Sequence, residues 1–407
     1  MAESVRMAIV GAGQAGLALS HELTHAAIEH VVLERGSVGE SWRRRWDSFR
    51  LVIPNETVLL PGSPYDGDDP DGFMPKAEIV DYLDRYARSF SAPMRTGVEV
   101  TAVEPLDNGT FMLRTSTGEI RARQVVLASG GYQRAHRPAA ARQIPVDSVM
   151  TVDAEGYTNP GALPEGDVLI VGSGQTGCQL AEECFEAGRS VYLACGRAPW
   201  VPRRVDGRDA VRWGLETDFY ESRLADLPSP SARFVSNPQF TGHGGGRDLN
   251  FRTLQTLGVQ LVGRFEGVED GRVHFANDLH ASVAFGDARY SEFRDLIAAH
   301  CLARSMPVPA MPDPKRFEAN PPESIDLARV GAVIFTTGFR PDYASWVAAP
   351  GAFDDAGFPI QVDGSSTIVP GLHFMGVHFQ RKRKSATLFG VAEDAAVLAE
   401  HLVTKAR

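Results

Sequence analysis

The sequence predicts an α/β fold built from two dinucleotide-binding units of the Rossmann type. The motif Gly-x-Gly-x-x-Gly occurs twice, at residues 11–16 and 172–177, each time directly after a short apolar run. A helical pattern and a second apolar run follow each motif, which is the order of a βαβ unit. The architecture is therefore duplicated at long range, and both copies have the context that a glycine turn needs to bind a dinucleotide.

The first unit lies at the start of the chain. We expect a strand at 7–10, a helix from the motif to about Glu29 and a strand at 31–33 that ends at Glu34. The first glycine makes the tight turn, the second lets the backbone approach a pyrophosphate, and the third allows close packing of helix on strand. Because Glu34 follows Gly11 by 23 residues, its carboxylate can accept hydrogen bonds from ribose hydroxyls. This unit therefore suits FAD or NAD.

The second unit has a different residue where coenzyme specificity is set. Strands are expected at 167–171 and 190–194, with a helix between them to about Ala187. No carboxylate closes the second strand; Arg197 follows it, with Arg203 and Arg204 beyond. Guanidinium groups pair with a 2′-phosphate, so this unit favours NADPH over NADH. The alternative is a glycine turn followed by solvated arginines.

Proline-rich segments divide the remainder of the chain. Residues 137–163 are irregular, and residues 306–323 carry six prolines and are predicted to be a wrapping connector. A terminal helix is expected at 391–403. We predict an FAD-binding domain at 1–150, an NADPH-binding domain at 160–325 and a return segment of the FAD-binding domain at 326–407.

Composition excludes several classes of protein. With 407 residues the chain is long enough for about two or three domains, and a net charge of −10 argues against a nucleic-acid binder. There is no apolar run of membrane length and no signal-peptide core, so we expect a cytoplasmic protein without an integral membrane segment. The four cysteines form no CxxC pair, and neither they nor the 11 histidines have metal-ligand spacing. No metal is expected.

The order of nine segments resembles that of the class B flavin-dependent monooxygenases over nearly the whole chain. Within that family, the flavin-containing monooxygenases and the bacterial relatives of the plant auxin-forming monooxygenases are the most similar. The segments that carry the resemblance are 11–16, 33–36, 39–43, 46–51, 54–55, 127–130, 172–177, 335–341 and 390–394.

The resemblance implies that the NADPH domain is inserted into the FAD domain, with two crossings between them. It assigns residues to FAD, to NADPH and to the crossings. The FAD residues are Gly11, Gly13, Gln14, Ala15, Gly16, Glu34, Arg35, Ser41, Trp42, Arg43, Val100, Leu388, Gly390 and Val391. The NADPH residues are Gly172, Gly174, Gln175, Thr176, Gly177 and Arg197, and the crossings are Ser129, Gly130, Thr337 and Gly338.

The activity implied by this resemblance is an NADPH- and O₂-dependent monooxygenase. Such enzymes form a C4a-(hydro)peroxyflavin and oxygenate a small organic substrate at nitrogen, at sulfur or at a carbonyl carbon. The alternative is an NADPH-dependent FAD reductase or oxidase that acts on a quinone or releases hydrogen peroxide. A non-catalytic nucleotide sensor would not need two differently tuned motifs. The expected partners are the substrate and O₂, and a homodimer remains an open alternative to a monomer.

Two departures from the family pattern weaken any inference about the substrate. The FxGxxxHxxx(Y/F/W) fingerprint is replaced by Asp147, Val149, Asp153 and Tyr157, so that only the final aromatic residue is kept. In addition, the charged Glu56 stands where an aromatic residue is expected.

Asn55 is the best single candidate for a catalytic residue. Its amide has donors and an acceptor, so it can hold a bound nicotinamide or a peroxide oxygen. The alternative is a turn residue, because Pro-Asn pairs are common in turns.

Two further segments have two interpretations each. Residues 239–247 form either a cover for NADPH or a surface loop, and the basic run 381–384 either neutralises an anion or is solvated. Trp200, Trp213 and Trp346 either line a pocket or belong to the core.

Overall fold

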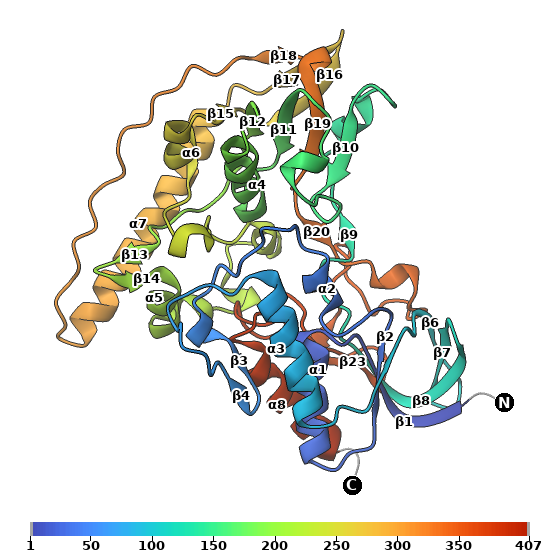
Figure 1. Cartoon of the computed structure of the whole chain (residues 1–407). Helices are drawn as coiled ribbons and strands as arrows, with labels where there is room; N and C mark the ends of the chain where they lie inside the picture. Colours follow the sequence, from blue (N-terminus) through green and yellow to red (C-terminus); the bar gives the residue numbers. More distant parts are fainter. Residues whose placement is uncertain (1–2, 405–407) are drawn as a thin grey trace.

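The computed structural model describes residues 3–404 and contains two main sheets, a mixed one with a parallel centre and a parallel one, one in each half of the molecule (Figure 1). The first sheet has nine strands: seven follow the order β21-β22-β23-β8-β1-β2-β5, and β6 and β7 extend from β8. Their bounds are β1 Glu3–Val10, β2 Val31–Glu34, β5 Met94–Thr96, β6 Val100–Pro105, β7 Phe111–Thr115, β8 Gly118–Leu127, β21 Gln361–Val362, β22 Ser365–Ser366 and β23 Leu372–Phe374.

The central strand β1 is buried on both faces, as expected for a parallel strand covered on both sides. Met7 and Ile9 belong to one core, and Ala8 and Val10 to another. Helices α1 (Gln14–His25), α3 (Lys76–Ser89) and α8 (Val391–Thr404) pack on the first core (Figure 1). The alternation of side chains along β1 thus joins two hydrophobic layers through one sheet.

The second sheet has five parallel strands in the order β10-β19-β11-β12-β15. Their bounds are β10 Met150–Asp153, β11 Asp167–Val171, β12 Val191–Ala194, β15 Gln260–Val262 and β19 Val330–Phe335. Helices α4 (Gln175–Glu186), α6 (Phe251–Leu257) and α7 (Leu279–Ala303) cover one face. A small antiparallel sheet of β16 (Phe265–Glu269), β17 (Arg272–Phe275) and β18 (Ser324–Asp326) packs on the other.

Several short elements complete the fold around the junction of the halves. They are the helices α2 (Glu40–Arg43) and α5 (Ala210–Glu216) and the hairpins β3–β4 (Leu59–Leu60 with Ser63–Pro64) and β13–β14 (Arg204–Val205 with Arg208–Asp209).

The chain crosses between the two sheets twice, and the crossings pair with each other. Strand β9 (Arg134–Ala135) follows β8, strand β20 (Phe339–Arg340) follows β19, and the two are antiparallel partners. The N–H of His136 donates to the carbonyl of Gly338 at 2.9 Å, and the Thr337 hydroxyl donates to the carbonyl of His136. Both crossings therefore lie in one two-stranded ribbon (Figure 1).

Two strands of the second sheet lie outside the segment 160–325 that we predict for the NADPH-binding domain. β10 begins at residue 150 and β19 spans 330–335, yet both belong to the second sheet. The proline-rich segment 306–323 suggested a boundary near 326. In the structure this segment runs along α6 and α7, where the carbonyls of Lys315 and Pro312 accept hydrogen bonds from Arg252 and Tyr290. The chain returns to the first sheet only after Phe335.

Among residues 3–404, no helix has the length and apolar content needed to cross a bilayer. The same part of the chain contains no group of three or more His, Cys, Asp or Glu side chains arranged to hold a metal ion.

Candidate functional site

The first glycine turn forms a cradle with space at its second glycine. Gly11 has φ of +111°, and a Cβ there would lie 2.6 Å from the carbonyl oxygen of Ala128. Gly16 packs directly on the carbonyl of Gly11, whereas a Cβ on Gly13 would meet nothing within 4 Å. No side chain caps the N-terminus of α1, so its first N–H groups are available to an anion. This arrangement fits the diphosphate of a dinucleotide.

Glu34 is fixed at the end of β2 by backbone donors. Its carboxylate accepts hydrogen bonds from the N–H groups of Ala12 (2.8 Å) and Gly36 (2.9 Å), and the side chain is buried. Each carboxylate oxygen retains a second lone pair with which it can accept a ribose hydroxyl. Arg35 beside it is exposed, and Val100 begins β6 two residues after Val98, whose N–H donates to the carbonyl of Glu34.

Gln14 joins three of the predicted flavin-side segments. Its Oε1 accepts a hydrogen bond from Nε1 of Trp42, and its Nε2 donates to the carbonyl of Ala386, both at 3.1 Å. Leu388 is buried, and its carbonyl accepts the N–H of Leu59 at 3.0 Å. The segments around residues 42, 59 and 386–388 therefore converge on the N-terminus of α1.

The other residues that the resemblance assigns to FAD differ in their exposure and in their contacts. Ala15 is buried in α1, Ser41 is exposed on α2, and Val391 is buried at the first position of α8. Gly390 packs on the backbone of Lys384. The guanidinium of Arg43, by contrast, donates to Asp84 at 2.8 Å and to the carbonyl of Val38 at 3.2 Å. Arg43 is therefore bound within the protein.

The second glycine turn resembles the first, except that a Cβ on its second glycine, Gly174, would lie 3.1 Å from the Cβ of Ser236. Gly172 has φ of +105°, and a Cβ there would lie 2.9 Å from the carbonyl carbon of Thr336. Gly177 packs on the carbonyl of Gly172, and the N-terminus of α4 has no side-chain cap. Gln175 donates to the carbonyl of Pro238 at 3.1 Å, and Thr176 is half-buried beside it. A second dinucleotide phosphate therefore fits here.

The three arginines that follow β12 have different environments. Arg203 is buried, pairs with Asp209 at 2.7 Å and lies between the rings of Phe73 and Phe240. The guanidinium of Arg204 donates to the carbonyls of Gly245 (2.8 Å) and Gly246 (2.6 Å). Arg197 is exposed, and no described residue pairs with it. Of the arginines that the sequence offered for a 2′-phosphate, Arg197 is the one left free within residues 3–404.

Each crossing begins where a glycine turn packs. Ala128, against which Gly11 lies, precedes Ser129, and Thr336, against which Gly172 lies, precedes Thr337. Gln133 donates to the carbonyl of Gly130 at 2.7 Å and to the Ser129 hydroxyl at 3.1 Å, which holds the first crossing in shape. Gly130 and Gly338 both have positive φ, +77° and +86°. The ribbon therefore connects the two cradles directly.

Asn55 organises the loop that follows it. Its Nδ2 donates to the carbonyl of Asp69 at 2.9 Å, its Oδ1 accepts the N–H of Met74 at 2.7 Å, and its side chain is buried. Glu56, which departs from the family pattern, pairs with Arg212 of α5, and Arg212 also pairs with Asp71 at 2.5 Å. The charge at position 56 thus ties the first half of the molecule to the second.

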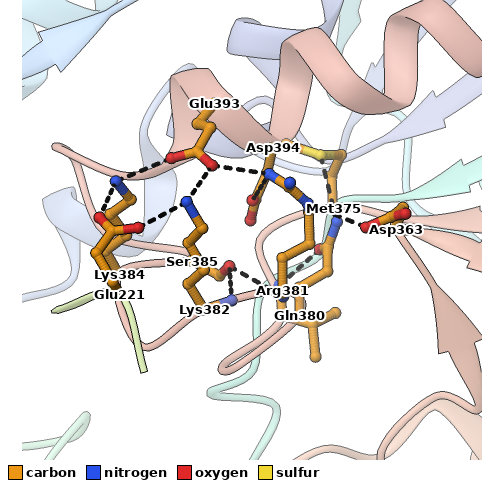
Figure 2. Close-up of polar contacts among 12 residues, drawn as sticks. Glu221, Asp363, Met375, Gln380, Arg381, Lys382, Lys384, Ser385, Glu393 and Asp394 are labelled. Carbon is orange, nitrogen blue, oxygen red and sulfur yellow. Dashed lines mark hydrogen bonds and ion pairs between the residues drawn. The ribbon is translucent and has the colours of Figure 1, made fainter. Parts of the chain in front are cut away.

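Three of the four residues of the basic run 381–384 form ion pairs inside the protein (Figure 2). The fourth, Arg383, donates to the Ser222 hydroxyl at 3.1 Å and lies over the rings of Phe219 and Phe379. Arg381 pairs with Asp363, Glu393 and Asp394, and Lys382 and Lys384 both pair with Glu221 and Glu393. Burial opposes ionisation of Glu393, but the hydrogen bonds from Lys382 and Lys384 prevail and lower its pKa to about 2. We therefore do not assign this run to a phosphate or to an acidic substrate.

Residues of the altered fingerprint and of the glycine-rich segment 239–247 form structural contacts. In the altered fingerprint, Asp153 accepts a hydrogen bond from Arg137 at 2.7 Å, and the buried Tyr157 hydroxyl lies 3.6 Å from Sγ of Cys184. In the glycine-rich segment, the His243 ring lies 3.1 Å from the carbonyl of Ser48, which ties this segment to the first half of the molecule.

Sequence reasoning missed Arg45. No signal in the run Arg43-Arg44-Arg45 distinguishes this residue from its neighbours, yet its guanidinium alone in that run lacks a polar partner among residues 3–404.

The chain matches one protein family and resembles several oxidoreductases in sequence. The pyridine nucleotide-disulphide oxidoreductase family matches residues 8–221. An uncharacterized CzcO-like oxidoreductase of Geobacillus kaustophilus is 30% identical over 98% of both chains. A probable indole-3-pyruvate monooxygenase of Arabidopsis thaliana, YUCCA3, is 23% identical over 98% of this chain and 86% of its own length.

Two solved structures share the fold over the full length of both chains. A flavin-containing monooxygenase from Stenotrophomonas maltophilia superimposes with a TM-score of 0.68 at 19% identity. The bacillithiol disulfide reductase of Staphylococcus aureus superimposes with a TM-score of 0.65 at 13% identity. The α/β fold with two Rossmann-like units that the sequence predicts is confirmed.

Proposed function

Because the chain belongs to the pyridine nucleotide-disulphide oxidoreductase family and is related to flavin monooxygenases, we propose that it is an NADPH- and O₂-dependent flavoprotein monooxygenase. The chain itself is a flavin-dependent oxidoreductase. What we propose beyond this is that NADPH is its coenzyme and that its reaction is an oxygenation with O₂. One observation supports both: two uncapped helix N-termini follow glycine turns, and the residues on which those turns pack, Ala128 and Thr336, lead into the two strands of a single ribbon.

We assign FAD to the first cradle and NADPH to the second. Glu34 favours an adenosine with free ribose hydroxyls, and the exposed Arg197 favours a 2′-phosphate. When bound, the two cofactors supply hydride transfer and the activation of O₂. The protein supplies binding, orientation and the exclusion of water.

Asn55 remains our candidate for the polar group beside the reacting atoms. An amide nitrogen carries two N–H groups, and Asp69 takes one of them, so one is left for a ligand. The buried position of Asn55 limits the access of water, which is what suppression of hydrogen peroxide release requires. In this proposal Asn55 orders the loop 69–74 and contributes one hydrogen bond at the site.

A disulfide reductase mechanism lacks support in the cysteines. All four cysteines are buried, and burial raises the pKa of Cys178, Cys184 and Cys195, which keeps these thiols protonated and unreactive. The competing function is therefore an NADPH-dependent reductase or oxidase that acts on a quinone or releases hydrogen peroxide.

The test is to measure NADPH oxidation, O₂ uptake and hydrogen peroxide release by the FAD-loaded protein, with and without a panel of amines, thioethers and ketones. A monooxygenase oxidises NADPH with one O₂ consumed, and its peroxide yield falls when a substrate is added. Peroxide release equal to NADPH oxidation under all conditions, or electron transfer to a quinone without O₂ uptake, would establish the competing function instead.

A further inference from the structure

Arg45 presents a cation without a polar partner at the junction of the two halves. The side chain of Arg45 is half-buried, and its Nε is shielded from water without a hydrogen bond. None of the described residues forms an ion pair with the guanidinium of Arg45. Burial lowers the pKa of Arg45, although Tyr132 and the carboxylate of Glu155 partly offset this from a distance. Removing a guanidinium from water without a partner is unfavourable, so its presence here calls for an explanation.

The neighbouring arginines show what an ordinary structural role looks like in this segment. Arg43 pairs with Asp84 at 2.8 Å, Arg44 pairs with Glu40 at 3.0 Å, and Arg50 donates to the carbonyl of Phe73 at 3.1 Å. Arg45 has aromatic contacts instead: its Cζ lies 5.7 Å from the ring centre of Phe49 and 5.5 Å from that of Tyr132. The cation is thus held between two rings, and its hydrogen-bonding edge is unused.

Arg45 follows helix α2 by two residues, and α2 lies near the ribbon of β9 and β20 that carries both crossings (Figure 1). Tyr132 belongs to the first crossing, and its ring centre lies 5.1 Å from that of Phe339 in the second. Tyr132 is 65% exposed, so an apolar surface borders the cation on its open side. A ligand at this point meets the guanidinium together with the exposed ring of Tyr132, whereas Phe49 is buried.

The phosphates of the cofactors have other partners in the proposed function. The two helix N-termini serve the two diphosphates, and Arg197 serves the 2′-phosphate. Arg45 is therefore a surplus cation beside the domain junction. We propose that Arg45 binds the carboxylate of the organic substrate, with the exposed ring of Tyr132 in contact with its apolar part. This proposal rests on the proposed function, which requires an organic substrate. The planar fork of arginine matches the two oxygens of a carboxylate.

The experiment titrates the FAD-loaded full chain with benzoate and, in parallel, with the neutral benzamide, using calorimetry and the visible flavin spectrum. We expect benzoate to bind more tightly than benzamide, and Arg45→Gln to weaken benzoate binding by about ten- to hundredfold, the loss expected for a charge-assisted hydrogen bond. Arg45→Lys keeps the charge without the fork and should fall between the two. Arg44→Gln, which alters an exposed ion pair, is the matched control and should bind benzoate as the parent does.

Equal benzoate affinity in the parent and in Arg45→Gln overturns the proposal. A loss of NADP⁺ binding or of FAD content in Arg45→Gln with unchanged benzoate binding also overturns it, because Arg45 would then serve a cofactor. Without benzoate, we expect the melting temperature of Arg45→Gln to equal or exceed that of the parent, since an unpaired cation is removed; a fall of several degrees would assign Arg45 a structural role. Because benzoate binding requires neither NADPH nor O₂, this result stands apart from any failure of the monooxygenase assignment.

Discussion

The indole Nε1 of Trp42 donates a hydrogen bond of 3.1 Å to Oε1 of Gln14, and this contact determines which way the Gln14 amide faces. With Oε1 turned to Trp42, Nε2 is directed to the carbonyl of Ala386, a residue with φ of +72°. One amide thus links helix α1, helix α2 and the segment that leads into α8. The N-terminus at which we place the FAD diphosphate is therefore held by contacts from three parts of the chain.

Trp42→Phe tests this link. The variant keeps an aromatic ring near Phe49 but leaves Oε1 of Gln14 without its donor, so we expect the free energy of unfolding to fall by about 1 kcal/mol. Urea denaturation of the apoprotein measures this loss. We also expect faster FAD release from the variant; an unchanged rate would show that the link does not order the site.

Gly11→Ala and Gly13→Ala form a matched pair. At Gly11 the new Cβ meets the backbone of Ala128 in a left-handed conformation, so we expect both lower stability and loss of FAD. At Gly13 the new Cβ has open space within the protein and meets only a bound diphosphate. Gly13→Ala should therefore melt like the parent as apoprotein yet bind FAD weakly, as measured by flavin content and fluorescence. Full FAD content in both variants would remove FAD from this cradle.

Arg197→Ala tests the choice of coenzyme. Arg197 is exposed and unpaired among residues 3–404, so its removal should leave stability unchanged while raising the KM for NADPH much more than that for NADH. One lost charge-assisted hydrogen bond corresponds to about ten- to hundredfold. Steady-state kinetics with both coenzymes measure this difference. Equal kcat/KM for NADPH and NADH in the parent would already contradict the assignment.

Asn55→Ala tests the candidate catalytic residue. FAD content and reduction by NADPH should be nearly intact, while hydrogen peroxide released per NADPH rises, because a buried polar group that restrains peroxide loss is removed. The N–H of Met74 and the carbonyl of Asp69 also lose their partner, which lowers stability by about 1–3 kcal/mol.

Asn55→Asp is the companion variant. It preserves an acceptor for Met74 but removes the amide donor, both to the Asp69 carbonyl and to a ligand, so we expect it to raise the peroxide yield as Asn55→Ala does. If Asn55→Ala loses stability but keeps the parent's peroxide yield, Asn55 serves the loop alone.

Glu393 gives the cluster of Figure 2 a defined dependence on pH. Its pKa in the folded protein is about 2, below the ordinary 4.5, so its contribution to stability is present above pH 4.5 and is lost as the pH falls toward 2. Since the side chain is 36% exposed, solvent screening reduces this contribution to about 1 kcal/mol. Glu393→Gln should lower the free energy of unfolding at pH 7 and should show a smaller difference from the parent below pH 4. A constant difference across this range would contradict the assignment.

Much of the fold follows from local sequence. The strand at 167–171 and the start of α8 at residue 391 lie where the apolar pattern places them, because a parallel strand covered on both faces appears as a continuous apolar run. The roles of individual charges do not follow, since they depend on partners far away in the chain. Arg43 and Arg45 are the same residue type two positions apart, yet Arg43 donates to the distant Asp84, whereas Arg45 lies over the ring of the distant Tyr132. Likewise, Glu221 pairs with Lys382 and Lys384 of the basic run, which lie far from it in the sequence.

The paired crossings also determine how the two halves can move. A two-stranded ribbon bends readily across its flat face but resists sliding of one strand along the other, because sliding breaks its cross-strand hydrogen bonds. Bending of the ribbon is therefore an easier deformation at the crossings than sliding. The ion pairs of Arg212 with Glu56 and Asp71 also join the two halves, through helix α5. Because the carboxylates of these pairs are partly exposed, we expect a rise in ionic strength to weaken this connection while the hydrogen-bonded ribbon is unaffected.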